Sequence, residues 1–173
     1  MRDFLRPIFK FLLLILLQVT VLKALELGAA NWWITPFVYI IFILELPIRI
    51  APITLLLSAM GMGLVIDLFY DSLGFHASAA VFVAFLRFYF LKLIIPKDGL
   101  DPNASPVISS IGRLKYGLYI FLMLLCYHLW FFIIEIFRFS DFFLRFSQAI
   151  VSAIFATILC FIIHFIFQKQ KKK

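Results

Sequence analysis

Long apolar runs, broken only by short polar stretches, are the feature that most limits how this chain can fold. About 20 consecutive apolar residues span the hydrocarbon core of a bilayer. The 173 residues are enough for six such runs and leave only short loops between them. The apolar fraction is 65%, where soluble domains have about 45–50% even with glycine counted. A soluble fold of this size has no interior large enough for that surface, so the excess must face lipid.

The polar breaks predict an all-α integral membrane protein in which residues 1–173 form one compact bundle of six transmembrane helices. The predicted spans are about 7–25, 36–48, 51–70, 75–95, 116–137 and 143–167. The second span is the weakest, because it is short, contains Glu45 and is interrupted by Pro47. The first run could also be a signal peptide cleaved near Gly28–Ala30. Its length, and the membrane segment that follows it, favour an uncleaved span.

The connections between the spans carry their own signals. Trp32 and Trp33 indicate an aromatic belt at one interface. The longest polar stretch begins at Pro96–Gly99, and a short amphipathic piece over Val107–Leu114 is predicted to lie on the membrane surface. A turn is predicted at Arg138–Asp141, before the last span. These stretches are too short for a water-soluble domain or a nucleotide-binding module on either side of the membrane.

The basic residues predict the orientation. With both termini in the cytoplasm, all but Lys23, Arg138 and Arg145 of the 16 lysines and arginines fall on the cytoplasmic side. This bias predicts an even number of crossings. It also assigns the net charge of +7 to membrane topology and anionic lipid rather than to nucleic acid. Cys126 and Cys160 each lie alone inside an apolar run, so neither a disulfide framework nor a zinc site is expected.

The third and fourth spans each carry a stripe of small residues together with ionisable groups. The stripes consist of Ala59, Gly63 and Asp67 on the third span, and of His76, Ala80, Ala84 and Arg87 on the fourth. Residues four apart share one face of a helix, and small residues let two helix backbones approach closely. Packing of the two stripes against each other within the chain is favoured. Binding of one stripe to another protein is the alternative.

A polar cluster is predicted near the outer ends of these spans. Asp67, Asp71 and His76 fall there, and Glu135 and Arg138 could join them. Such a cluster could bind a metal or act in acid–base chemistry, or it could cap helix ends through hydrogen bonds. The cap is favoured, because the sequence has no ligand spacing such as His-Glu-x-x-His.

Two further residues complete these predictions. Gly74 is expected to take a positive φ in the short turn between the two spans. His128 lies near mid-membrane without the continuous chain of groups that a proton relay needs. No catalytic, cofactor or metal site is predicted.

Two motifs around the third and fourth spans resemble the rod-shape-determining MreD family of bacteria. They are Gly-Leu-Val-Ile-Asp at Gly63–Asp67 and Leu-Gly-Phe-His-Ala at Leu73–Ala77, followed by the alanine-rich stretch Ser78–Arg87. The loop at Pro96–Gly99 and the turn at Phe137–Phe143 also look like one branch of that family. The resemblance covers essentially the whole chain. The central motif is its most specific part, and Ser58–Met60 departs slightly from the family pattern.

The resemblance implies a non-enzymatic scaffold of the elongasome, the peptidoglycan-synthesis complex that maintains rod shape, in the bacterial inner membrane. Its implied partners are MreC and, indirectly, MreB, RodA and a penicillin-binding transpeptidase. The family is similar in fold to the substrate-binding subunits of energy-coupling-factor transporters. The alternative function is therefore a small-solute-binding subunit of a membrane transporter. Which surface meets MreC, and whether the chain forms a homodimer, are left open by the sequence.

Overall fold

Within the part of the chain that the structure describes, four helices are long and apolar enough to cross a membrane. They are α4 (Pro52–Tyr70), α5 (Phe75–Ile94), α7 (Arg113–Glu135) and α8 (Phe142–Lys169). The computed structural model describes residues 2–24, 34–95, 101, 103–135 and 142–169, and the side chains of 8–24 and 143–166 within the first and last ranges. All regular elements among these residues are helices. The protein is therefore an all-helical membrane protein, and these four helices coincide with the predicted third to sixth spans.

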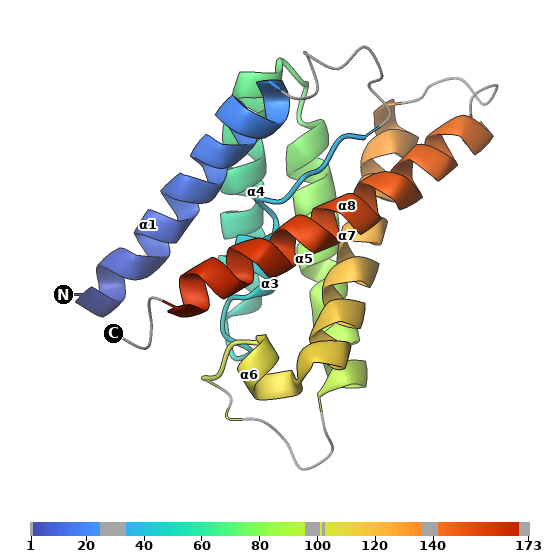
Figure 1. The fold of residues 1–173 in the computed structure, drawn as a ribbon. Helices are drawn as coiled ribbons and strands as arrows, with labels where there is room; N and C mark the ends of the chain where they lie inside the picture. The colour runs from blue at the N-terminus through green and yellow to red at the C-terminus, as the bar shows by residue number, and fades with distance from the viewer. Residues whose placement is uncertain (1, 25–33, 96–100, 102, 136–141, 170–173) are drawn as a thin grey trace.

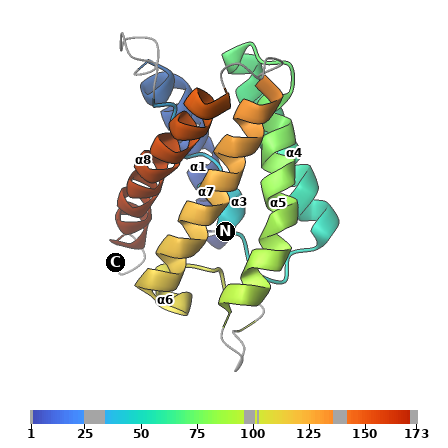
Figure 2. The same cartoon turned by 90° about the vertical axis from the view of Figure 1, so that its right-hand side faces the viewer.

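The four long helices form a continuous packed series. α4 packs on α5, α5 on α7, and α7 on α8. α4, α5 and α7 run roughly parallel or antiparallel to one another, while α8 crosses in front of them at a steep angle (Figure 1). Seen from the side, α8 lies next to α7 and away from α4 (Figure 2). Alanines on one side of α8, such as Ala149, Ala153 and Ala156, are fully buried and allow this close packing.

The N-terminal helix lies along the other side of the bundle. α1 (Arg2–Leu16) continues directly into η1 (Leu17–Leu22), one turn of wider π-helix. Its apolar part, Ile8–Leu22, is shorter than the four long helices and lies within the predicted first span. Leu14 and Gln18 on the inner side are fully buried, whereas Leu16 on the outer side is 63% exposed. Single π turns of this kind interrupt helices where a side chain needs a particular position, which here is that of Gln18.

The expected second membrane helix, over residues 36–48, is not formed in this structure. The chain is non-helical from residue 34 to 38, and only Ile41–Leu44 are helical, as the four-residue helix α3. Pro36 and Pro47 bracket this stretch, and neither can donate a backbone hydrogen bond within a helix. We call residues 34–50 the central segment, because it threads between α8 in front and α4 and α5 behind (Figure 1). Its side chains from Phe37 to Ile41 are between 0 and 2% exposed.

A second short helix lies at the end of the bundle where α5 stops and α7 starts. Of the amphipathic piece predicted over Val107–Leu114, Ile108–Ile111 form a separate short helix, α6, which lies at the ends of the long helices (Figures 1 and 2). Leu114 belongs to α7. Gly112 then takes a φ of 84° and reverses the chain into α7, which begins before the predicted start of the span. The predicted features at Trp32–Trp33, Pro96–Gly99 and Arg138–Asp141 lie outside the described residues.

Candidate functional site

The turn between α4 and α5 is organised by Asp67. Its Oδ1 accepts hydrogen bonds from the His76 amide at 3.0 Å and from the Ser72 hydroxyl at 2.5 Å. Its Oδ2 accepts one from the Ala77 amide at 2.9 Å. The first amides of a helix have no partner within the helix, and a carboxylate there also interacts favourably with the helix dipole. The prediction that Asp67 and His76 lie close together is confirmed. The carboxylate acts as a cap for α5.

Gly74 and Asp71 shape the same turn. Gly74 has a φ of 85°, as predicted, and Asp71 also has a positive φ, of 53°. Glycine takes such a conformation freely, and aspartate is among the few other residues that tolerate it. The Asp71 side chain is exposed, and among the described members of the expected outer cluster a hydrogen bond joins Asp67 to His76. Glu135 is exposed at the end of α7, and Arg138 lies outside the described residues.

The two small-residue stripes face each other inside the chain. Ala59, Ala80 and Ala84 are 0% exposed. A Cβ atom on Gly63 would collide with the backbone of Ala77, so α4 and α5 cross at the distance that only glycine permits. Packing within the chain, the favoured interpretation, is what the structure contains. A partner helix has no access to either stripe in this arrangement.

The His76 ring belongs to a buried group that the sequence did not indicate. His76 Nδ1 lies 2.8 Å from the Tyr127 hydroxyl, which lies 2.5 Å from the Tyr39 hydroxyl. Phe37 and Phe131 enclose the same imidazole, with ring centroids 4.7 and 4.6 Å away. These residues come from α5, α7 and the central segment, so no local spacing could have revealed their proximity. The histidine is used to join three parts of the fold.

Arg87 binds the middle of the central segment. Its Nε donates to the Leu44 carbonyl at 3.3 Å, and its Nη2 donates to the carbonyls of Leu46 and, at 3.3 Å, Pro47. The Tyr119 hydroxyl also donates to the Leu44 carbonyl, at 3.0 Å. The last carbonyls of a helix have no partner within it, and α3 is too short to satisfy its own. A fully buried arginine inside a membrane bundle thus serves the protein's own backbone.

Polar side chains of other helices bind the start of the central segment. The Gln18 amide donates to the Pro36 carbonyl at 3.2 Å and accepts from the Val38 amide at 3.0 Å. His128 Nε2 lies 3.0 Å from the Thr35 carbonyl, and the Ser152 hydroxyl accepts from the Thr35 amide at 3.1 Å. An unsatisfied backbone group costs several kcal/mol in hydrocarbon, so non-helical chain persists at membrane depth only where protein surrounds it.

Glu45, next to the carbonyls that Arg87 binds, ties the central segment to three helices. It forms an ion pair with Lys10 of α1 and accepts a hydrogen bond from the Tyr116 hydroxyl of α7. His164 Nδ1 of α8 lies 2.8 Å from the same carboxylate. The sequence marked Glu45 only as a weakness of the second span. The signal that could have indicated this cluster was an acid within a predicted span, together with Lys10 and His164 near the same predicted end of two other spans.

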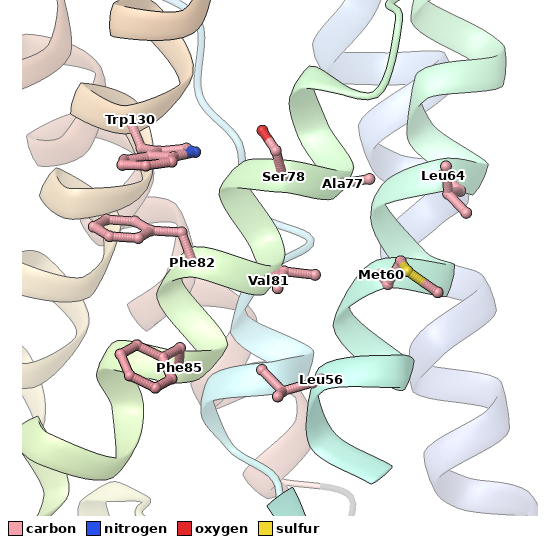
Figure 3. Close-up of a pocket in the computed structure, with 9 residues that line it drawn as sticks. All are labelled: Leu56, Met60, Leu64, Ala77, Ser78, Val81, Phe82, Phe85 and Trp130. Carbon is pink, nitrogen blue, oxygen red and sulfur yellow. The ribbon is translucent and has the colours of Figure 1, made fainter. Parts of the chain in front are cut away.

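An apolar groove runs along the outside of α4 and α5, with a volume of about 580 Å³. Its walls are Leu56, Met60 and Leu64 of α4, Ala77, Ser78, Val81, Phe82 and Phe85 of α5, and Trp130 of α7 (Figure 3). The Ser78 hydroxyl already donates to the Phe75 carbonyl, and the Trp130 ring stacks on Phe82 with centroids 4.1 Å apart. The groove therefore offers shape and apolar contact rather than acid–base chemistry.

The buried polar side chains described above bond other parts of the chain. Within the described ranges, no group of three or more histidine, cysteine, aspartate or glutamate side chains could hold a metal ion. Cys126 and Cys160 are both free thiols. No family model, curated protein or solved structure matches this chain. A functional assignment therefore rests on the residues and the geometry described above.

Proposed function

We propose that this chain is a membrane scaffold subunit of a bacterial cell-elongation complex, in the role of the MreD family. It would bind MreC within the inner membrane. Through MreC it would be linked to the actin-like MreB filament, to the RodA glycosyltransferase and to a penicillin-binding transpeptidase. The motifs at Gly63–Asp67 and Leu73–Ala77, which resemble that family, are the starting point for this proposal.

The observation that carries the proposal is how the fold uses those motifs. Gly63 lets α5 cross α4, Asp67 caps α5, and Gly74 forms the turn. His76 uses its amide and its ring to join α5 to α4 and α7. An enzyme needs polar groups that can reach a substrate, whereas a scaffold needs a defined shape. Because the motif residues hold the helices in place, they support the scaffold proposal.

The alternative, a solute-binding subunit with a fold like that of energy-coupling-factor transporters, needs room for its solute. Here the middle of the bundle is filled by the chain itself. Val38, Tyr39, Ile40 and Ile41 of the central segment are all 0% exposed. A filled centre favours the scaffold. A small solute retained by the purified native protein would favour the alternative.

We further infer six membrane crossings, with α1 and η1 as the first and the central segment as the second. Both termini would then be cytoplasmic, on the side where α6 lies. The charges support this orientation, because Arg49, Lys92, Arg113 and Lys115 are exposed at the α6 end. An excess of basic residues is typical of cytoplasmic membrane edges.

Cysteine labelling tests this topology. Asn31→Cys and Asn103→Cys are each introduced into a variant without Cys126 and Cys160, and intact cells are treated with a membrane-impermeant thiol reagent. Labelling is expected for Asn31→Cys and not for Asn103→Cys. The reverse pattern would overturn the orientation.

Copurification and depletion test the function itself. The chain is co-expressed with the MreC of the same genome and extracted from membranes in mild detergent. It is expected to bring MreC with it, and depletion of the chain is expected to round rod-shaped cells. If cell shape and wall synthesis persist on depletion while uptake of a small solute falls, the scaffold proposal is wrong and the transporter alternative holds.

A further inference from the structure

The lysines and arginines whose side chains the structure describes divide into two groups according to what they bind. Four of them contact other groups in the protein: Lys10 pairs with Glu45, Lys23 donates to the Phe69 carbonyl, Arg87 binds the central segment and Arg145 donates to Gln148. The other four, Arg49, Lys92, Arg113 and Lys115, are exposed. None of these four forms a hydrogen bond or an ion pair with another described residue. We call Arg49, Lys92, Arg113 and Lys115 the basic rim.

The basic rim lies at one end of the bundle although its members are far apart in sequence. Arg49 is in the link from α3 to α4, Lys92 is in the last turn of α5, and Arg113 and Lys115 are in the first turn of α7. These segments meet at the end of the molecule where α6 lies (Figures 1 and 2).

Hydrogen bonds hold these segments together. The Ile48 amide donates to the Ala104 carbonyl at 3.0 Å, which joins the α3–α4 link to the loop before α6. Arg87 of α5 donates to the Pro47 carbonyl, and Tyr116 of α7 donates to Glu45. The folded chain therefore keeps the segments that carry the four cations together at this end of the bundle.

The opposite end has a different charge balance. Lys23 lies over the Tyr70 ring at 5.2 Å, and Arg145 lies over the Phe132 ring at 5.9 Å, so both cations are partly engaged by the protein. Asp71 and Glu135 are exposed at this end. At the α6 end the exposed carboxylate of Asp101 accepts a hydrogen bond from the Asn103 amide at 2.9 Å. Among the described residues, the two ends thus differ in charge and in how far their cations are engaged by the protein.

Leu114 adds an apolar element to the basic rim. It lies between Arg113 and Lys115 and is 86% exposed, whereas Ile111 of α6 is buried against the bundle. Cations flanking an exposed leucine are suited to the boundary between lipid headgroups and acyl chains, where each group finds its preferred surroundings.

We propose that the basic rim is a binding surface for anionic phospholipids of one leaflet. The guanidinium and ammonium groups of Arg49, Lys92, Arg113 and Lys115 contact headgroup phosphates, and Leu114 inserts among the upper acyl carbons. Charge complementarity selects this occupant, since the four cations have no partner among the described residues and gather at the end of the bundle where a leaflet of anionic lipid presents negative charges. This inference does not rest on the scaffold role.

Lipid retention by the purified full chain tests the inference. The protein is exchanged into an equimolar mixture of phosphatidylglycerol and phosphatidylcholine, and the lipids that remain bound are counted by native mass spectrometry. A basic residue near an anionic surface contributes about a fivefold preference. Arg113→Gln/Lys115→Gln is therefore expected to reduce the preference for phosphatidylglycerol by roughly tenfold or more. The charge-conserving Arg113→Lys/Lys115→Arg is expected to keep it.

Lys23→Gln/Arg145→Gln is the matched control, because it removes the same charge from the opposite end. It is expected to leave the preference unchanged. An equal loss in both double variants would mean that only net charge matters, and it would overturn the proposal. For the unmodified chain, the preference is expected to fall as salt concentration rises. An unmodified chain that retains both lipids equally at low salt would overturn the proposal without any variant.

Discussion

The α4–α5 pair and the central segment satisfy their backbones in opposite ways. The two helices bond their own amides and carbonyls, and they need help only at the ends, where Asp67 binds the free amides of α5. The central segment forms such bonds mainly around α3, and its remaining backbone groups depend on side chains of four surrounding helical elements, including Arg87 and Gln18. A helix pair can therefore tolerate many changes away from its contact line. The central segment, in contrast, should be destabilised by a change at any of the distant side chains that bond its backbone.

The largest effect should come from breaking the helix pair at its closest point. Gly63→Leu would force a side chain into the backbone of Ala77, which cannot move without separating α4 from α5. We expect a loss of about 3 kcal/mol or more and little folded protein in the membrane fraction. Gly61→Leu is the control on the same helix, because a Cβ there meets nothing within 4 Å. Equal yields of monodisperse protein from both variants would show that the crossing is not tight.

The central segment should be nearly as sensitive at Arg87. Arg87→Met keeps much of the side-chain volume but removes the donors to the carbonyls of Leu44, Leu46 and Pro47. We expect a loss of about 3 kcal/mol, because buried acceptors are left without partners. The control is Lys92→Met, an exposed cation on the same helix, for which a change within about 0.5 kcal/mol is expected. Thermal unfolding in detergent measures both, and similar midpoints would contradict the role given to Arg87.

The ion pair between Lys10 and Glu45 of the central segment should have a smaller effect. Glu45→Gln removes the negative charge between Lys10 and His164 and so breaks the ion pair with the Lys10 ammonium. We expect a loss of about 2 kcal/mol, less than for a fully buried pair because Lys10 retains some exposure. The double variant Lys10→Met/Glu45→Gln should recover part of this loss. A double variant less stable than the single one would show that Lys10 acts independently of Glu45.

The cap on α5 should matter less than the crossing it lies beside. Asp67→Ala removes the acceptor of the His76 and Ala77 amides and is expected to cost about 1–2 kcal/mol. Asp67→Asn keeps one acceptor and should cost about half as much. Both are measured as shifts in the unfolding midpoint, next to a complementation assay of cell shape. Normal amounts of folded Asp67→Ala protein with complete loss of function would contradict a cap and indicate a direct role for the carboxylate.

The smallest effect should come from one hydrogen bond at the start of the central segment. Ser152→Ala leaves the Thr35 amide without its acceptor and is expected to cost about 1 kcal/mol. Ser147→Ala is the matched control on the same helix, since that hydroxyl is exposed and bonds only within α8. The difference in unfolding midpoint between the two variants measures the contribution of the Thr35–Ser152 bond. No difference would mean that water replaces the lost partner.

The sequence was most informative about the helix pair. Four apolar runs of the sequence form the four long helices, because about twenty apolar residues in hydrocarbon have few other ways to satisfy the hydrogen bonds of their backbone. The proximity of Asp67 and His76, and the positive φ of Gly74, followed from the shortness of the turn between two helices. Local spacing was sufficient there, since the interacting residues are neighbours in the chain.

Only the tertiary structure decided the form of the central segment. Hydropathy alone does not distinguish an apolar run that forms a lipid-facing helix from one that forms a non-helical segment surrounded by helices. The difference depends on donors and acceptors supplied from far away in sequence, such as Gln18, Arg87 and Ser152. Hydropathy therefore determined which residues leave water. The polar side chains inside the bundle determined which of these residues could leave water without forming a helix. Each backbone group that lacks a helical hydrogen bond needs a partner among those side chains.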